Sequence, residues 1–210
     1  MRATQMAQVT SGIRAILSNP VVYELFQTLL GAHRVRTWFV DEVVRPRAGM
    51  RVLDIGCGPA DILAYFPAVE YQGFDISEDY LERARKRFGQ RGDFRCQELT
   101  SADVTAMPPF DIVIAIGLLH HLDDAGATGL LRLALQALRP SGRLITMDPV
   151  LEPGQHPIAR FLVKRDRGQH VRTRNGYAAL AGAVFDAPIV TVRHKSGIPY
   201  THCVMECTRR

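Results

Sequence analysis

The sequence lacks the features of a membrane or exported protein. Its longest apolar run, Ile112 to Leu119, is far too short to span a bilayer. The first residues, Met1 to Gln5, carry no apolar signal core, and no repeat or low-complexity tract follows. We therefore expect no transmembrane segment, no export and a cytoplasmic protein.

Cysteine is also scarce. The four cysteines stand at positions 57, 96, 203 and 207, and no two of them form a Cys-x-x-Cys pair. We expect free, buried thiols in a reducing compartment.

Acidic residues are only slightly outnumbered, with 26 Lys and Arg against 21 Asp and Glu. The resulting net charge of +5 is modest, and the basic clusters at 83–95 and 160–174 have no aromatic residues interleaved for base stacking. Nucleic-acid binding is therefore not favoured. For the 83–95 cluster we expect a solvated helix face.

What the sequence does contain is a regular alternation of strands and helices. Apolar runs predict strands near 51–55, 69–75, 93–97, 111–116, 143–148, 189–194 and 199–207. Helices are predicted between them, with N-caps at Ser77, Asp123 and Thr173, and two more precede the first strand, one starting at Asn19-Pro20 and one spanning 35–43. This order indicates one α/β domain over 1–210 with a doubly wound sheet. Its parts would be N-terminal helices (1–45), a binding half (46–150), a long connection (151–172) and a C-terminal helix with two strands (173–210).

The most informative segment is the end of the first strand. Asp54 is followed by Gly56 and Gly58, which permit a tight turn and a close approach of a ligand to the backbone. Pro59 suits the first turn of a helix. A second strand ends in Asp75, about 20 residues later, where a carboxylate can accept hydrogen bonds from ribose hydroxyls. Asp61 stands where a dehydrogenase fingerprint has a third Gly or Ala, so that class is disfavoured.

Four segments in this order, 52–60, 73–77, 110–124 and 138–150, resemble the class I S-adenosylmethionine-dependent methyltransferases. The resemblance implies a Rossmann-like, mostly parallel seven-stranded sheet with an antiparallel last strand. It also implies S-adenosylmethionine as methyl donor and S-adenosylhomocysteine as product. Asp54 would orient the methionine amino group, Asp75 would hold the ribose, and Ile76 would pack on the adenine. The other implied cofactor residues are Gly56, Cys57, Gly58, Glu98 and Gly117.

The segment after the fourth strand contains the adjacent pair His120-His121. Adjacent side chains diverge, and a zinc site needs three or four ligands, so we do not expect a metal. The fifth strand ends in Asp148 at the same predicted sheet edge. His120, His121 and Asp148 are the candidate catalytic residues, because histidine can accept a proton from a hydroxyl near neutral pH.

The connection 151–172 is longer than a simple turn requires and leaves the ligand-binding edge of the sheet. We expect it to form a lid, with Arg167 and Arg172 gripping an anionic group of a small-molecule acceptor. Tyr177, on the next helix, is a further candidate for substrate binding. The alternative for the arginines is a solvated basic loop.

Two other functions stay open at this point. The same enzyme class could act on RNA or protein, although no appended binding domain is evident in 1–210. The chain could also be a non-catalytic module that binds the nucleoside and regulates a partner, because residues that bind a cofactor do not by themselves perform chemistry.

Overall fold

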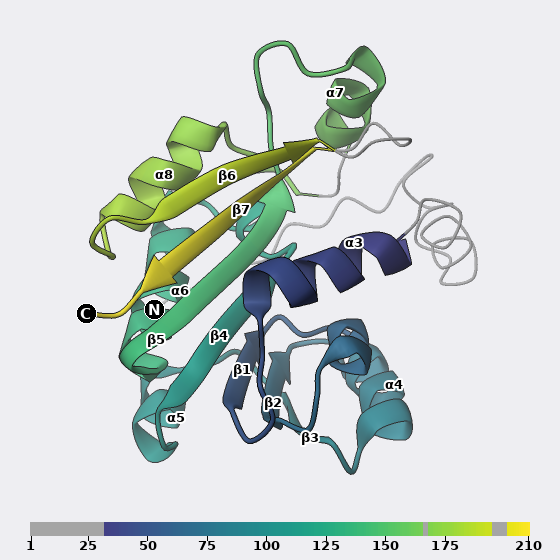
Figure 1. The fold of residues 1–210 in the computed structure, drawn as a ribbon, viewed down its shortest axis with the longest axis vertical. Helices are drawn as coiled ribbons and strands as arrows, with labels where there is room; N and C mark the ends of the chain where they lie inside the picture. Colours follow the sequence, from purple (N-terminus) through teal and green to yellow (C-terminus); the bar gives the residue numbers. More distant parts are fainter. Residues whose placement is uncertain (1–31, 166–167, 195–200) are drawn as a thin grey trace.

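The computed structural model describes residues 32–165, 168–194 and 201–210. They form a seven-stranded sheet with helices on both faces (Figure 1). The strand order is β3-β2-β1-β4-β5-β7-β6. Strand β7 runs antiparallel to β5 and β6, and the other neighbouring strands pair in parallel. The predicted doubly wound sheet with an antiparallel last strand is confirmed.

The strands lie within about two residues of their predicted positions, with one exception. Strand β5 begins at Leu138, five residues earlier than expected, and its register with β4 shifts between Phe110 and Ile112. The bounds are β1 Arg51–Ile55, β2 Glu70–Asp75, β3 Gly92–Cys96, β4 Phe110–Ile116, β5 Leu138–Pro149, β6 Ile189–His194 and β7 Thr201–Thr208.

The helices begin where their caps predict. The side chains of Ser77, Asp123 and Thr173 each accept a hydrogen bond from a backbone N–H in the first turn. The α-helices are α3 Ala32–Trp38, α4 Glu78–Phe88, α5 Ser101–Ala106, α6 Asp124–Ala137, α7 Pro157–Lys164 and α8 Arg174–Gly182. The described residues also form one π-helix, η1 Phe39–Val44, and two 3₁₀-helices, η2 Asp61–Tyr65 and η3 Leu119–His121.

Some of these elements were not predicted, and some predictions cannot be compared. The short helices α5 and α7 and the 3₁₀-helix η3 were not predicted, because they lack a long apolar period. The helix expected from Asn19-Pro20 and the joint at 197–199 lie outside the described residues. Within the described ranges, none of the helices has both the length and the hydropathy needed to cross a membrane.

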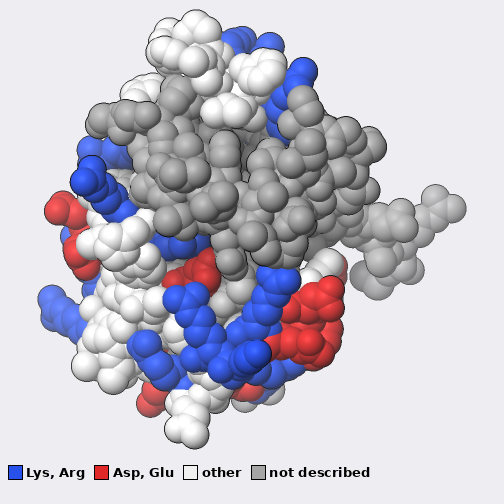
Figure 2. Space-filling view, turned by 90° about the vertical axis from the view of Figure 1, so that its right-hand side faces the viewer, with Lys and Arg blue, Asp and Glu red and all other residues white. Residues whose placement is uncertain are grey.

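One face of the sheet packs against α3, η1, η2 and α4, and α3 crosses it in Figure 1. Arg83, Arg85, Arg87 and Arg91 are exposed on the outer side of this layer. Figure 2, which views the molecule from the side of α4, shows basic and acidic side chains next to each other on this face. Arg87 pairs with Asp61 at 2.9 Å, and Arg85 bonds to Glu78. The cluster is thus a solvent-facing helix surface with local ion pairs, as expected.

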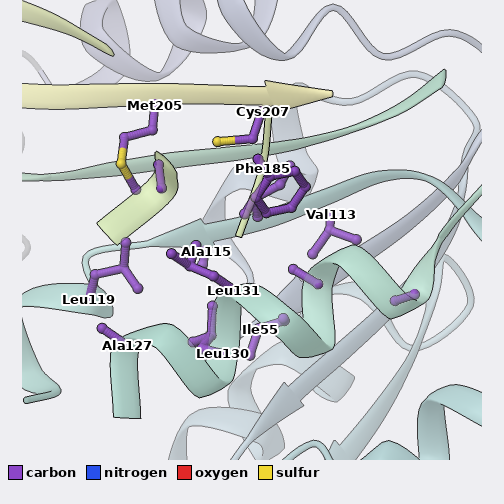
Figure 3. Packing of buried hydrophobic residues seen from close by; sticks show 14 of the residues in the cluster. Ile55, Val113, Ala115, Leu119, Ala127, Leu130, Leu131, Phe185, Met205 and Cys207 are labelled. Carbon is purple, nitrogen blue, oxygen red and sulfur yellow. The ribbon is translucent and has the colours of Figure 1, made fainter. Parts of the chain in front are cut away.

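The opposite face packs against α5, α6 and α8. Figure 3 shows side chains of β4 and β7 meeting those of α6, with Phe185 between them. Of the four cysteines, Cys57, Cys203 and Cys207 are buried, whereas Cys96 is exposed at the end of β3. The expectation of a buried thiol was therefore wrong for Cys96, because β3 is an edge strand.

Candidate functional site

The glycine turn lies at the carboxyl end of β1. Gly56 and Gly58 have φ angles of 72° and 52°, in the left-handed region that favours glycine. A side chain at Gly58 would meet no atom of the described residues within 4 Å, so the backbone there borders space that these residues leave open. The turn leads into the 3₁₀-helix η2 rather than the predicted α-helix. Only 14 residues separate β1 from β2, which leaves room for a single short turn.

Asp75 ties the end of β2 to this turn. One carboxylate oxygen accepts the backbone N–H of Gly58 and the other accepts that of Ser77, both at 2.8 Å. A carboxylate has about four acceptor positions, so both oxygens can still accept hydroxyl donors. Beside it, Ile76 leaves 49% of its surface exposed. An acid next to an exposed apolar side chain at an open glycine turn fits a nucleoside.

Asp54 lies deeper, with only 2% of its surface exposed. The hydroxyl of Tyr71 donates to its Oδ2 at 2.5 Å. Burial raises the pKa of Asp54 to about 7, the Tyr71 hydrogen bond opposes that rise, and the charge of Asp75 adds to it. This carboxyl is therefore poised to change charge near neutral pH.

The remaining predicted cofactor residues differ in their surroundings. Cys57 is buried, and a side chain at Gly73 would come within 2.7 Å of its sulfur. Burial raises the pKa of this thiol well above its usual range, so it is a packing residue of the turn and not a nucleophile. Glu98 is exposed in the segment after β3. Gly117 has a φ of 66° and donates its N–H to the carbonyl of Met147.

The structure brings His120 and Asp148 together from two segments. The Nδ1 atom of His120 lies 2.8 Å from Oδ1 of Asp148, which also accepts the backbone N–H of His120 at 3.2 Å. Both side chains are buried, with 5% and 1% of their surfaces exposed. When Nδ1 donates to the carboxylate, the lone pair of the neutral ring is on Nε2. This is the arrangement of a histidine base oriented by an acid.

His121 lies next to this pair. Its ring packs against the ring of His120, with centroids 4.1 Å apart. In the ranges 32–165, 168–194 and 201–210, no three His, Cys, Asp or Glu side chains gather as metal ligands would.

Arg172 has a different function from the one predicted. Its guanidinium donates to the carbonyls of Leu119, Leu122 and His170 and twice to Asp124, at 2.8–3.0 Å. These five bonds use all five N–H donors of the side chain. The expectation that Arg172 grips an anionic substrate is therefore wrong, because the guanidinium instead fastens the 151–172 connection to the turn between β4 and α6.

Tyr177 also requires a correction. It is 1% exposed, and its hydroxyl donates to the carbonyl of Pro149 at 3.0 Å. The side chain is part of the core beneath the sheet edge and presents nothing to a substrate. Arg167 lies outside the described residues.

Two residues near the site were missed by sequence reasoning. Tyr71 was treated only as part of an apolar strand, although a hydroxyl-bearing ring two residues before a glycine can reach over that glycine. Gly168 was not singled out, yet a side chain there would come within 2.0 Å of Cδ2 of His120. The sequence held no signal for that contact, because residues 120 and 168 are far apart in the chain.

Comparison with known proteins agrees with this geometry. Residues 53–144 match the model of a family described as a methyltransferase domain. The ubiquinone/menaquinone biosynthesis C-methyltransferase UbiE of Ectopseudomonas oleovorans is 34% identical over 68% of this chain and 85% of its own length. The 27-O-demethylrifamycin SV methyltransferase of Amycolatopsis mediterranei (strain S699) is 39% identical over 51% of this chain and 41% of its own. The chain spans 41–63% of the length of the first four curated relatives.

Solved structures share the fold at low identity. The pyocyanin biosynthetic protein PhzM superposes with a TM-score of 0.67 at 18% identity, covering 94% of this chain and 61% of its own. The S-adenosylmethionine-dependent methyltransferase SibL gives 0.66 at 19% identity, covering 94% and 62%. With the sheet order, the glycine turn and these relatives in agreement, the chain belongs to the class I S-adenosylmethionine-dependent methyltransferase family.

Proposed function

We propose that this chain transfers the methyl group of S-adenosylmethionine to a small-molecule acceptor. The observation that carries the proposal is the joined turn at the ends of β1 and β2, where Asp75 holds the backbone of Gly58 next to open space and Ile76 stays exposed. The names of the relatives, a quinone C-methyltransferase and a rifamycin methyltransferase, support a small molecule.

The residues present fit the cofactor at each end. Asp75 would accept the ribose hydroxyls, Ile76 would cover the adenine, and Glu98 would lie near the adenine amino group. Asp54 would face the positively charged amino group of the methionine part, with Gly56 and Gly58 allowing close approach to the backbone. The bound cofactor supplies an electrophilic methyl group whose carbon–sulfur bond breaks as the acceptor's nucleophile bonds to the carbon.

His120 and Asp148 provide the base for a hydroxyl acceptor. The proton would pass from the acceptor hydroxyl to Nε2 of His120, and the Asp148 carboxylate would stabilise the resulting imidazolium. The hydrogen bond between them fixes the ring orientation before the acceptor arrives. A base held in place in this way suits an acceptor whose oxygen becomes more nucleophilic on losing its proton.

Residues 168–172, at the end of the long connection, are the proposed cover of the methyl-acceptor site. Gly168 lies against the His120 ring, and the N–H of His170 donates to the carbonyl of His120 at 2.9 Å. His120 is 5% exposed beneath this segment, so a methyl acceptor reaches it only when 168–170 moves aside. Arg172 anchors the cover at its far end and gives no support for an anionic acceptor.

Calorimetric titration with S-adenosylhomocysteine tests the cofactor site. We expect wild-type binding and a more than tenfold weaker affinity for Asp75→Asn, because a charged acceptor is lost at the ribose. Asp93→Asn, an exposed β3 acid that pairs with Arg95, is the matched control and should bind like wild type. An affinity unchanged by Asp75→Asn would place the ribose elsewhere.

Turnover is tested with labelled S-adenosylmethionine, the enzyme and a metabolite extract, followed by mass spectrometry of the labelled products. A labelled small molecule supports the proposal. Cofactor binding with no labelled product in any fraction would favour a non-catalytic nucleoside-binding module. Label found in RNA, with strongly salt-dependent RNA affinity, would favour the nucleic-acid alternative.

A further inference from the structure

Asp54 has an unusual partner for a buried acid. It lies in β1, between β2 and β4, with Gly73 and Ile114 as its register neighbours. Among the described residues, only the Tyr71 hydroxyl donates a hydrogen bond to its carboxylate. A single neutral donor is little compensation for a carboxylate that is 2% exposed, since buried charges normally acquire several. The interaction with Tyr71 therefore decides how this carboxyl is held.

The position of the Tyr71 hydroxyl is set by packing. Tyr71 and Gly73 lie on the same face of β2, because side chains two residues apart point to the same side. A side chain at Gly73 would come within 3.1 Å of the Tyr71 ring, so glycine leaves the path from Tyr71 to Asp54 open. The ring also packs against Phe94 and Phe66, with centroids 5.8 and 6.5 Å away. The ring cannot turn away from Asp54 without disturbing this cluster.

The charges around Asp54 act in opposite directions. Burial and the charge of Asp75 raise the pKa of Asp54, and the Tyr71 hydrogen bond lowers it. Cys57 is the other titratable group at this turn, and Arg85 of α4 acts on that thiol from outside. Tyr71 is therefore the group next to Asp54 that favours the ionised carboxylate.

We propose that Tyr71 is a positioning residue of the cofactor site: its hydroxyl holds the Asp54 carboxyl in place for the cofactor's amino group and favours the ionised form, and binding of that amino group then drives off the remaining proton. The inference rests on the proposed function and deepens it. A cation that binds next to a half-protonated carboxyl drives its proton off, so one proton is released for each carboxyl that was neutral before binding.

The sign of the pH dependence follows from this linkage. Below about pH 7 the Asp54 carboxyl is protonated in the cofactor-free chain, so affinity for the cofactor falls as the pH falls. Removing the Tyr71 hydroxyl removes the one effect that favours ionisation. The pH at which affinity declines then moves upward.

The test measures S-adenosylhomocysteine affinity by calorimetry from pH 5.5 to 8.5, in pairs of buffers with different ionisation enthalpies to count released protons. Tyr71→Phe keeps the ring and should shift the affinity profile upward by about one pH unit, which is about tenfold weaker binding near pH 6.5 and a smaller difference at pH 8.5. Asp54→Asn should release no proton on binding. Tyr65→Phe, whose hydroxyl bonds to His33 instead, is the matched control and should follow wild type.

Each outcome decides the proposal. A weaker affinity of Tyr71→Phe that is uniform over the pH range would show a packing role only, and an unshifted profile would overturn the inference while leaving the proposed function intact. If the wild-type chain does not bind S-adenosylhomocysteine at all, the proposed function fails and the inference about Tyr71 fails with it. If Tyr71→Phe does not fold, site-specific fluorotyrosine at 71, a stronger donor with the same ring, must shift the profile to lower pH, and no shift overturns the inference.

Discussion

The two halves of the site are held together in different ways. On the cofactor side, Asp75 is fixed by backbone N–H groups of the adjoining turns, Gly58 and Ser77. On the methyl-acceptor side, His120 is fixed by Asp148 and by the segment that Arg172 anchors, groups 28 or more residues apart in sequence. The first half is built from short motifs at the ends of the neighbouring strands β1 and β2, and the second from side chains of segments that lie farther apart in the sequence.

This difference predicts where mutations act. A change at an exposed residue of the cofactor side, such as Ile76, should alter affinity for the cofactor and leave stability nearly unchanged, whereas a change at buried Asp54 should also alter stability. A change on the acceptor side should alter catalysis or stability and leave cofactor affinity unchanged. The four variants below separate these outcomes, and they follow from the largest expected effect to the smallest.

The largest effect is expected for His120→Gln. Removing a general base typically costs between a hundredfold and ten-thousandfold, so we expect kcat to fall about 1,000-fold while S-adenosylhomocysteine affinity stays within twofold. His33→Gln changes an exposed histidine of α3 that bonds to Tyr65 and serves as the control. A loss of less than tenfold for His120→Gln would make the His120–Asp148 pair structural.

The next effect is on stability. Arg172→Gln removes hydrogen bonds to the part-buried carbonyls of Leu119 and Leu122, and we expect the free energy of unfolding to fall by about 3 kcal/mol, less than the sum of the bonds because they act as a unit. Urea denaturation measures the loss. Arg165→Gln, an arginine stacked on exposed Phe161, should change stability little. If Arg172→Gln were fully stable but raised the KM for the methyl acceptor, the substrate-gripping role would return.

Much of the cofactor side could be predicted from the sequence. The cofactor half follows local rules: an acid at a strand end, glycines at a turn and a cap at Ser77 are each visible in a few consecutive residues. The sheet order follows from the same alternation. A helix was expected to begin at Pro59, and the segment between β1 and β2 forms only the short 3₁₀-helix η2.

The methyl-acceptor half could be predicted only in part. That His120 and Asp148 lie near one edge was expected, because parallel strands end there. The use of Arg172 could not be predicted, since its partners are backbone carbonyls, which carry no sequence signal. Tyr177 was misassigned for a related reason: burial beneath the edge depends on how α8 packs, and position in the chain does not reveal it.

The third prediction concerns the pH dependence of stability. The Asp54 carboxyl keeps its proton up to about pH 7 in the folded chain but loses it near 3.8 when unfolded. Because the folded chain binds more protons between these values, stability should fall as the pH rises from about 4 to 7 and then level off. Asp54→Asn removes this contribution and should gain about 2 kcal/mol on wild type between pH 4 and 8, with structural relaxation reducing the effect.

Urea denaturation at several pH values measures that difference, and Asp93→Asn, at an exposed site, is the control that should leave the slope unchanged. Parallel curves for wild type and Asp54→Asn would show that Asp54 is ionised throughout. Such a result would mean that the charge of Asp54, like that of Asp75, is compensated within the folded chain before any ligand binds.

The smallest expected effect is at the apolar cover of the cofactor side. Ile76→Ala shortens a side chain that is 49% exposed, so unfolding free energy should change by no more than about 0.5 kcal/mol. If Ile76 packs on the adenine, the lost apolar contact is worth about 1 kcal/mol, or roughly fivefold in S-adenosylhomocysteine affinity. Ile189→Ala is a close match, because Ile189 is 60% exposed on β6, the edge strand at the other end of the sheet from β3. Equal affinities for the two variants would mean that Ile76 is an ordinary exposed side chain. A large loss of stability for Ile76→Ala would show that the cofactor side depends on packing beyond its strand-end motifs.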